Sequence, residues 1–307
     1  MNDELAQKAE WHRVGKYSVT SELFLDLIFT ETCNAACPFC IARTEKRAVP
    51  DYEKWRESLR RAFAEYEIRS VIILGGEATV DPLFERRLNE LERVLPEPGP
   101  RNIILTTNGI RLRDPAFLDM LCRTRINSVN LSYMNEDKGV NDGIFHADTL
   151  TAEEIRHIYG ILKEHGKTMR INTNVYRGNL DSPEQMENFV RFFSGCCDAI
   201  KFSPLMRTDM FGTVKAVTAY TAEKAIPESE IRVLYNRFLA RREHAETAPG
   251  ILGYIDYAET EVDGQRVILK FGQVEDKYDR DYVIPTLKLY PNGTLSNEWS
   301  CEKNILI

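Results

Sequence analysis

Short apolar runs alternate with segments of helical periodicity over the first two-thirds of the chain, and this alternation limits the fold more than any other feature. Six runs have the length and composition of buried strands: 23–30, 70–76, 102–109, 126–133, 167–176 and 198–206. Segments with helical periodicity follow the first five runs: 51–67, 82–94, 115–123, 151–166 and 182–195. Strands separated by helices pair in parallel. Six such units are too few for a closed eight-stranded barrel, so the sequence predicts an α/β fold, a partial, open (β/α)6 barrel of the TIM type.

The pattern changes after residue 210. A helix is expected over about 228–242, and alternating strand-like segments follow it: "GYIDYAET", "QRVILKFG", "PTLKLY" and "GTLSNEW". The stretch "YPNGTL" joins the last two segments and contains Asn-Gly, which favours a tight hairpin. We therefore expect an N-terminal extension over 1–20, a core over 21–210 and a small C-terminal α+β cap over 211–307.

Charge and composition exclude several classes of protein. The formal net charge is -7, with basic residues dispersed among acidic ones, which argues against a nucleic-acid partner. The first residues are polar and lack a secretory pattern, and no apolar run approaches the ~20 residues that span a bilayer, so no membrane partner is expected. The seven cysteines are odd in number and lack the spacing of a disulfide framework. These features predict reduced thiols and a cytoplasmic location.

Three of the cysteines, Cys33, Cys37 and Cys40, directly follow the first expected strand in the spacing C-x₃-C-x₂-C. Thiolates at this spacing in one loop can surround a soft metal centre. A structural zinc site needs four protein ligands, and the other cysteines and the histidines are distant in sequence. A [4Fe–4S] cluster held by three thiolates instead leaves one iron open for a small molecule. The spacing favours the cluster, with zinc as the alternative.

Further motifs complete a family resemblance. The cysteine loop after the first strand, "LGGE" (74–77) after the second and the strand–helix alternation resemble the radical S-adenosylmethionine superfamily. The closer resemblance, over roughly residues 22–207, is to the branch that includes the GTP-cyclising enzyme of molybdenum cofactor biosynthesis. It implies two cofactors, a [4Fe–4S] cluster and S-adenosylmethionine. In that family the reduced cluster cleaves S-adenosylmethionine to methionine and a 5′-deoxyadenosyl radical, which abstracts a substrate hydrogen.

The resemblance assigns roles to residues by their position. Cys33, Cys37 and Cys40 look like the cluster ligands. The residues that look like the cofactor pocket lie in the cysteine loop or at strand ends: Phe39, Gly75, Gly76, Glu77, Ser132 and Met206. Glycines allow a close approach of the backbone, and a glutamate complements the methionyl amino group. We therefore expect a Gly76→Val variant to lose cofactor binding and to keep its fold.

A second set of polar residues falls where that branch faces its substrate or cofactor: Thr107, Asn108, Arg170 and Asn172. Arg170 suits a bidentate clamp on a carboxylate or phosphate, and the alternative is a surface ion pair. For the asparagines the alternative is a turn or a backbone cap. The polar stretch 135–146 follows the fourth strand and ends at His146, which suggests a substrate-contacting loop.

The C-terminal region departs from that branch. The molybdenum-cofactor enzyme has a second cysteine triplet there for another cluster, whereas this sequence has Cys301 alone, in "NEWSCEK". One thiol cannot hold a cluster, so GTP cyclisation is not supported and the cap is expected to be metal-free. Three interpretations of Cys301 stay open: a buried packing residue, a hydrogen-atom donor to a substrate radical, or a vestige of an auxiliary-cluster domain.

The leading hypothesis is a radical S-adenosylmethionine enzyme. Its substrate is expected to be a small polar metabolite, such as a nucleotide, sugar or amino acid derivative, in natural-product or cofactor biosynthesis. The resemblance also implies an electron donor such as flavodoxin or ferredoxin. One alternative is a peptide-modifying enzyme of the same superfamily, and another is a non-catalytic iron–sulfur or zinc protein.

Overall fold

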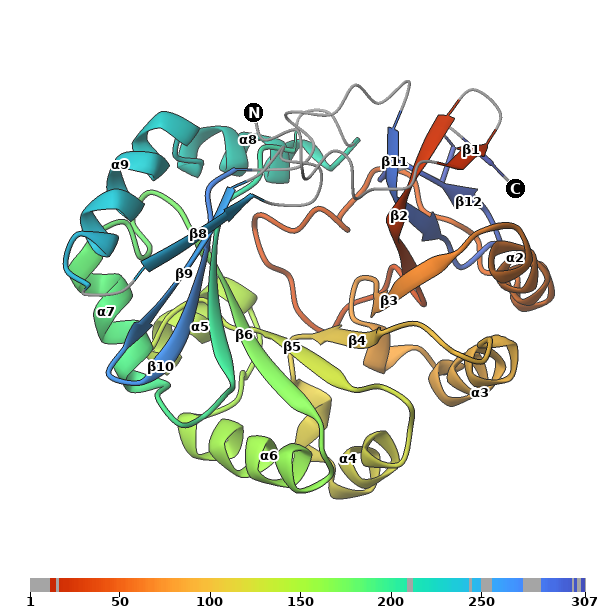
Figure 1. Cartoon of the computed structure of the whole chain (residues 1–307), viewed down its shortest axis with the longest axis horizontal. Helices are drawn as coiled ribbons and strands as arrows, with labels where there is room; N and C mark the ends of the chain where they lie inside the picture. Colours follow the sequence, from red (N-terminus) through yellow and green to blue (C-terminus); the bar gives the residue numbers. More distant parts are fainter. Residues whose placement is uncertain are drawn as a thin grey trace.

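The structure is a computed structural model that describes residues 12–14, 17–208, 212–242, 245–249, 256–272, 283–299, 301–302 and 305–306. Its centre is a parallel sheet in which six strands lie side by side in chain order (Figure 1). They are β2 (Tyr17–Ile28), β3 (Ile68–Leu74), β4 (Asn102–Thr107), β5 (Ser128–Ser132), β6 (Thr168–Val175) and β7 (Ala199–Pro204). Every neighbouring pair in this series is parallel. The strands curve into an incomplete barrel, so the predicted fold class is confirmed.

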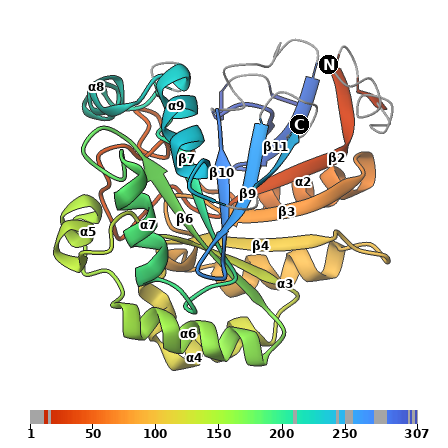
Figure 2. The same cartoon turned by 60° about the vertical axis from the view of Figure 1, so that its left-hand side comes forward.

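Helices cover the convex side of this sheet (Figures 1 and 2). The predicted ones are α2 (Tyr52–Glu65), α3 (Phe84–Val94), α4 (Pro115–Cys122), α6 (Ala152–Glu164), α7 (Pro183–Phe192) and α9 (Glu228–Leu239). Local capping explains several of their starting points. Thr151 and Ser182 each form a capping box at the start of α6 and α7, which satisfies backbone N–H groups that have no partner within the helix.

Four further helical elements among the described residues were not predicted: α5 (Lys138–Phe145), α8 (Lys215–Lys224) and the short 3₁₀ helices η1 (Ala78–Val80) and η2 (Ile110–Arg113). The segment 135–146, expected as a loop, therefore contains a helix. Asp137 caps it, because its side chain accepts a hydrogen bond from the Val140 N–H.

The described strands of the C-terminal region join the main sheet. They are β8 (Ala245–Pro249), β9 (Asp256–Val262), β10 (Gln265–Lys270), β11 (Val283–Leu289) and β12 (Leu295–Ser296). β10 pairs in parallel with β7 at one edge, and β11 pairs in parallel with β2 at the other. β9 and β8 continue antiparallel beyond β10, β12 lies antiparallel to β11, and β1 (His12–Val14) pairs with β2.

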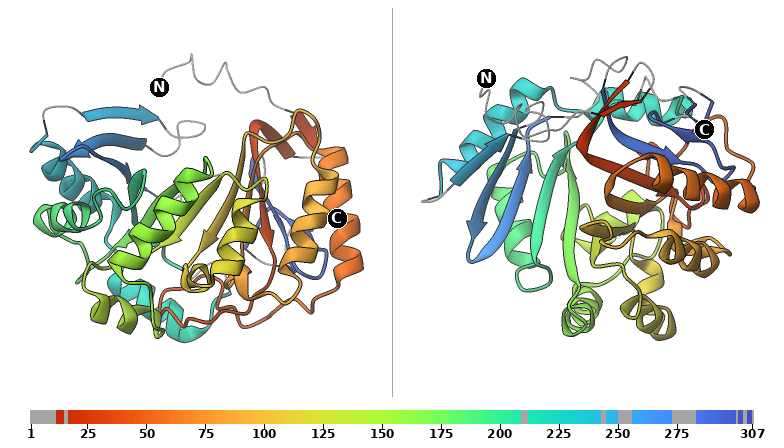
Figure 3. Two further views of the ribbon diagram at one scale, coloured as in Figure 1. Left: turned by 90° about the horizontal axis from the view of Figure 1, so that it is seen from below. Right: turned by 45° about the vertical axis from the view of Figure 1, so that its right-hand side comes forward.

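Within this region the "YPNGTL" hairpin is confirmed. The Tyr290 N–H donates to the Thr294 carbonyl, and Gly293 has φ +87°, which glycine adopts without strain. The two edges of the sheet that these strands occupy are seen from further directions in Figure 3. The division of the chain at residue 210 and a separate cap stay predictions.

Side chains on the strands alternate between a helix-covered face and the inside of the barrel. On β6 the outward residues Met169, Ile171 and Thr173 are buried, whereas Arg170 and Asn172 are half-buried. The outward residues form one apolar core with the helices. The inside of the barrel is therefore the polar side of the sheet. Among the described residues, no helix has the length and apolarity needed to cross a membrane.

Candidate active site

The cysteine loop begins just after β2, at the carboxyl end of the strand. Cys33, Cys37 and Cys40 are all half-buried, free thiols. The Arg43 guanidinium fixes the loop from one side, since its Nη1 donates to the carbonyls of Ala36 and Cys37, both at 3.3 Å. Parallel sheets bind ligands at this end of their strands, so the loop lies where a site is expected.

Two neighbouring elements hold the loop from its other sides. The Ala36 N–H donates to the Phe145 carbonyl at the end of α5, over 2.8 Å. The Asn108 side-chain amide, at the end of β4, donates to Asn34 over 2.7 Å. The loop is thus bonded to elements that follow two other strands of the barrel.

The three thiols have pKa values above the ordinary range. Burial raises the pKa of Cys33 to about 11. Burial also raises the pKa values of Cys37 and Cys40, and repulsion from the other two cysteines adds to the effect at Cys37. Without added positive charge the three groups are therefore protonated thiols. A metal centre that binds thiolates must displace these protons.

The donor set fits an iron–sulfur cluster. Among the described residues, no three His, Cys, Asp or Glu side chains converge closely enough to hold one metal ion. A structural zinc site needs four protein ligands, whereas the loop offers three thiols. In a [4Fe–4S] cluster each thiolate binds a different iron, so the sulfurs lie further apart. Cys33, Cys37 and Cys40 are the residues that would hold it.

The Gly-Gly-Glu motif packs against the start of the cysteine loop. The Gly76 N–H donates to the Thr30 carbonyl and the Glu77 N–H to the Thr32 carbonyl, each at 2.8 Å. A Cβ on Gly75 would lie 2.2 Å from the Thr30 carbonyl oxygen, and one on Gly76 would lie 2.3 Å from that of Thr32. The glycines are needed because two segments of this chain's own backbone meet here.

The close backbone contacts of Gly76 argue against the expectation that a Gly76→Val variant keeps its fold. Its side chain would collide with backbone atoms of Glu31 and Thr32, which cannot move aside as a flexible side chain can. A loss of cofactor binding in such a variant would not report on a direct contact with the cofactor.

Glu77 is buried and joins the end of β3 to the end of β4. Its Oε1 accepts from the Thr79 N–H, the Thr79 hydroxyl and the Thr107 hydroxyl at 3.1, 2.7 and 2.8 Å. Its Oε2 accepts from the Asn108 N–H at 2.7 Å. Burial raises the pKa of Glu77, and these hydrogen bonds oppose that effect. Of the two oxygens, only Oε2 keeps spare capacity to accept from a ligand.

A cavity of about 350 Å³ opens at this end of the barrel. Most residues predicted for the cofactors line it: Cys33, Cys37, Phe39, Cys40, Gly75, Gly76, Glu77, Thr107, Asn108, Ser132 and Met206. Asn174 and Ser203, at the ends of β6 and β7, contribute polar atoms to the same wall. The structure thus brings together residues spread over most of the core, and their roles as ligand contacts stay predictions.

Arg170 and Asn172 lie deeper in the barrel than this cavity. The Arg170 Nε donates to the Asn172 Oδ1 at 2.9 Å. Arg170 is half-buried inside the barrel, which argues against the alternative of a surface ion pair. Asn172 is paired in register with Ser132 on one side and with Lys201 on the other. Because Lys201 is two residues before Ser203, it lies about 7 Å below the cavity wall.

Lys201 is a functional candidate that the sequence analysis missed. Burial lowers its pKa strongly, and the charges of Arg170 and Lys270 lower it further. Its Nζ lies 5.3 Å from the centre of the Tyr257 ring. Burial also lowers the pKa of Arg170. The alternation of apolar and polar residues in "AIKFSP" places Lys201 on the face opposite Phe202, and this pattern could have identified Lys201 from the sequence.

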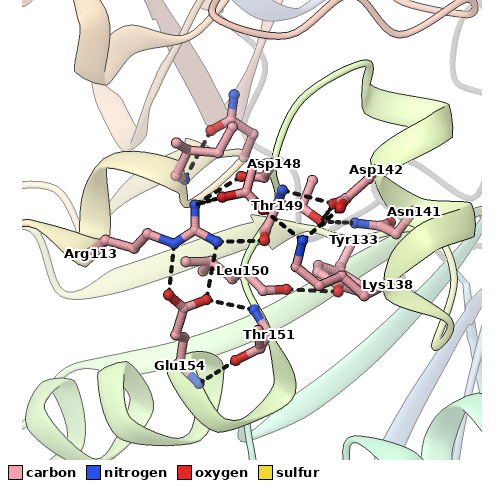
Figure 4. Close-up of polar contacts among 12 residues, drawn as sticks. Arg113, Tyr133, Lys138, Asn141, Asp142, Asp148, Thr149, Leu150, Thr151 and Glu154 are labelled. Atoms are coloured by element: carbon pink, nitrogen blue, oxygen red, sulfur yellow. Dashed lines mark hydrogen bonds and ion pairs between the residues drawn. The ribbon is translucent and has the colours of Figure 1, made fainter.

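Residues 133–154 form a polar network beside the site (Figure 4). Asn141 is fully buried; its Oδ1 accepts from the Met134 N–H at 2.8 Å and its amide donates to the Thr149 hydroxyl at 2.8 Å. Lys138 bonds both Asp142 and Asp148 at 2.6 Å. This network fixes α5, whose last residue, Phe145, lines the cavity. His146, expected in a substrate loop, ends α5 on the surface with φ +50°.

The Arg113 guanidinium forms the other half of the network (Figure 4). It bonds both oxygens of Glu154, at 2.8 and 3.1 Å. It also donates to the backbone carbonyls of Asp148 and Thr149, at 2.8 and 2.6 Å. The connection between α5 and α6 is therefore held to η2, the element that follows β4.

Cys301 lines a neighbouring cavity of about 280 Å³, together with Glu31 and Tyr290. This cavity shares Ile41, Gly75 and Trp299 with the first one. Cys301 is half-buried at the wall of this cavity, which is compatible both with a packing role and with hydrogen donation. Both roles stay predictions. The remaining cysteines are buried in the core.

Comparison with known proteins shows which family part of this chain resembles. The sequence profile of the Radical SAM superfamily matches residues 27–134. A probable GTP 3′,8-cyclase of Sulfurisphaera tokodaii is 28% identical over 169 residues, which are 55% of this chain and 51% of that protein. A GTP 3′,8-cyclase of Pelotomaculum thermopropionicum is 33% identical over 114 residues, 36% of this chain and 33% of that protein. The chain thus spans about half the length of the first of these relatives and about a third of the second.

Solved structures share the fold. Streptococcus suis SuiB bound to S-adenosylmethionine superposes with a TM-score of 0.61 and 18% identity, over 91% of this chain and 61% of SuiB. SuiB bound to its precursor peptide SuiA gives a TM-score of 0.60 at 19% identity, over 90% of this chain and 59% of that one. Residues 27–134 thus have the sequence of a radical S-adenosylmethionine domain, and parts of the chain are similar in sequence to GTP 3′,8-cyclases.

Proposed function

We propose that this chain is a radical S-adenosylmethionine enzyme whose substrate is a small anionic molecule bound inside the barrel. The observation that supports it most is the shared cavity: three thiols, the Gly-Gly-Glu motif and the ends of four further strands line one space of about 350 Å³. When bound by these residues, a reduced [4Fe–4S] cluster would supply the electron for the reductive cleavage of S-adenosylmethionine, and so the chemistry for removing a hydrogen atom from the substrate.

The chain's residues bind and orient the reactants. Cys33, Cys37 and Cys40 would hold the cluster at one side of the cavity. The open Oε2 of Glu77 and the hydroxyl of Ser132 are available to hydrogen-bond S-adenosylmethionine. Apolar side chains of Phe39, Leu74, Met134, Phe145, Leu205 and Met206 line the same space and limit the access of water.

The basic residues below the cavity support the proposed substrate class. Arg170 and Lys201 face the inside of the barrel, and burial disfavours their charged forms. Among the described residues, Lys201 lies against the ring of Tyr257. A carboxylate or phosphate that enters from the cavity would compensate both charges. A phosphorylated or carboxylated metabolite therefore fits better than a neutral one.

The activity is tested by 5′-deoxyadenosine release from anaerobically reconstituted protein with S-adenosylmethionine and dithionite. We expect about four irons per chain and measurable release. Alanine at Cys33, Cys37 and Cys40 together should abolish both, and alanine at the buried Cys122 should abolish neither. Stoichiometric zinc without iron uptake would refute the proposal in favour of a structural zinc site.

The substrate class has its own test. Candidate sugar phosphates, nucleotides and amino acid derivatives are compared with peptides for stimulation of 5′-deoxyadenosine release above the basal level. Stimulation by an anionic metabolite supports the proposal. Stimulation by peptides alone would overturn the substrate class, leaving the radical activity in place.

A further inference from the structure

Helix α8 lies across the outer side of the cysteine loop. The backbone just before it runs along the segment after Cys40, where Thr44 and Thr213 form an antiparallel bridge. The Val214 N–H donates to the Arg43 carbonyl at 2.9 Å, and the Glu45 N–H donates to the Gly212 carbonyl at 3.1 Å. In Figure 3, left, this helix and the cysteine loop lie together along the lower edge of the molecule.

The other end of α8 is fixed as well. The Arg177 N–H, in the turn after β6, donates to the Lys224 carbonyl at 2.9 Å. Midway, the hydroxyls of Thr221 and Thr208 are 3.0 Å apart, and Thr208 lines the cavity. The helix is therefore attached to the cysteine loop, to the end of β6 and to the cavity wall.

Three aromatic rings fill the space between α8 and the thiols. Phe39, which lies between Cys37 and Cys40 in sequence, has its ring centre 5.8 Å from that of Tyr176 and 6.3 Å from that of Tyr220. Tyr176 and Tyr220 are 6.3 Å apart and near perpendicular, at 69°. Tyr176 is only 3% exposed, and Tyr220, on α8, is the half-buried outer ring.

Tyr176 and Tyr220 also interact through their hydroxyl ends. Burial raises the pKa of Tyr176, and the charge of Tyr220, a hydrogen bond to Tyr220 and the charge of Cys37 raise it further. Tyr176 is thus an almost fully covered ring that lies against both Phe39 of the cysteine loop and Tyr220 of α8.

We propose that α8 is the outer cover of the cysteine loop, and that Tyr220 is a positioning residue that keeps water from the cluster and thereby holds its reduction potential low. The proposal rests on the proposed function, because it requires the cluster. An apolar shell around a metal site controls solvent access and local dielectric, and hence the potential. Reduction adds negative charge to the cluster, and water stabilises that charge, so opening the shell raises the potential.

The test compares Tyr220→Ala, Tyr220→Phe and wild type, with Glu223→Ala as the control on the exposed side of the same helix. Each protein is reconstituted anaerobically, and its iron content is measured. The rate of iron release to a chelator and the midpoint potential from a titration followed by electron paramagnetic resonance are then recorded. Neither readout depends on substrate turnover.

We expect Tyr220→Ala to bind iron, to release it roughly tenfold faster than wild type and to have a more positive midpoint potential, because it loses two ring–ring contacts over the loop. Tyr220→Phe keeps the ring but removes the hydroxyl that bonds Tyr176, so its values should lie between those of wild type and Tyr220→Ala, whereas those of Glu223→Ala should match wild type. Should the alanine variant not fold, Tyr220→Gln, which keeps most of the volume and admits water, is expected to give the same change.

The outcomes separate the two proposals. Wild-type protein that takes up no iron overturns the proposed function, and this inference with it. Wild-type protein that holds a cluster, together with a folded Tyr220→Ala or Tyr220→Gln variant of unchanged release rate and potential, overturns this inference alone.

Discussion

A Gly76→Ala substitution tests why the Gly-Gly-Glu motif contains glycine. The added Cβ would lie 2.3 Å from the Thr32 carbonyl oxygen, 2.7 Å from its carbonyl carbon and 2.8 Å from the Glu31 carbonyl oxygen. Ordinary contact begins near 3.4 Å, so the two backbone segments must separate by 3.4 − 2.3 = 1.1 Å. That movement stretches the 2.8 Å hydrogen bonds from Gly76 to Thr30 and from Glu77 to Thr32.

The expected cost combines two effects. Overpacking a tight contact typically costs about 1–3 kcal/mol, and each backbone hydrogen bond that is lost costs about 1 kcal/mol. We therefore expect Gly76→Ala to lower the free energy of unfolding by about 2–5 kcal/mol, before any cofactor is added. Chemical denaturation of the protein without its cofactors, followed by circular dichroism, measures this difference.

Gly160→Ala is the matched control. Gly160 lies within α6, and a Cβ there meets nothing within 4 Å. Alanine is favoured over glycine inside a helix by about 1 kcal/mol, so this variant should be as stable as wild type or slightly more stable. A Gly76→Ala protein that unfolds at the wild-type denaturant concentration, but fails to bind S-adenosylmethionine, would refute the backbone explanation and restore a direct role at the cofactor.

Three further outcomes are expected. Hydrogen bonds from Lys138 lower the pKa of Asp148; at Asp142 burial acts in the opposite direction but is outweighed by the bonds from Lys138 and Thr149. In the unfolded chain an aspartate has a pKa of about 3.9, and the pKa values of Asp142 and Asp148 in the folded protein are lower. Ionisation of these two groups therefore stabilises the folded protein above that pH, and this stabilisation is lost as the pH falls through their folded pKa values. Wild type should therefore lose more stability between pH 5 and 3 than Lys138→Met, and parallel losses in pH-dependent denaturation would contradict this. Asn141→Ala should cost about 2–3 kcal/mol of unfolding free energy, because it leaves the buried Met134 N–H without a partner; an unchanged denaturation midpoint would count against it. Lys201→Met should raise the KM for an anionic substrate at least tenfold while basal 5′-deoxyadenosine release stays unchanged, and an equal effect on a neutral analogue would argue against a charge contact.

The sequence was sufficient for the elements that carry a local signal. The buried strands are short runs of apolar residues, and helices such as α7 begin at a Ser-Pro pair, so the central strands and their helices were found within a few residues of their observed bounds, except that β2 begins six residues earlier than expected. The position of the cysteine loop also followed from local order, because it directly succeeds β2.

Other elements depend on contacts between distant segments. α8 was missed because it has no apolar stripe, with Val217 and Thr221 as its buried residues; it is held by backbone bonds to Arg43 and Arg177. α5 contains two glycines, which disfavour a helix, and is stabilised by Asn141 and its partners. The position of Arg170 inside the barrel likewise depends on strand register. Periodicity puts Arg170 on the face opposite Met169 and Ile171, but it does not say which face lines the barrel.

The pairing of β11 with β2 has a consequence for how the protein is made. During synthesis the six central strands leave the ribosome with both sheet edges open, because β10 and β11, which pair with those edges, are made last. Open edges of apolar strands are templates for pairing with other chains. The nascent barrel is thus exposed to aggregation for the time that the ribosome needs to add residues 205–289. A chaperone that binds extended apolar segments would act on this protein chiefly during that interval.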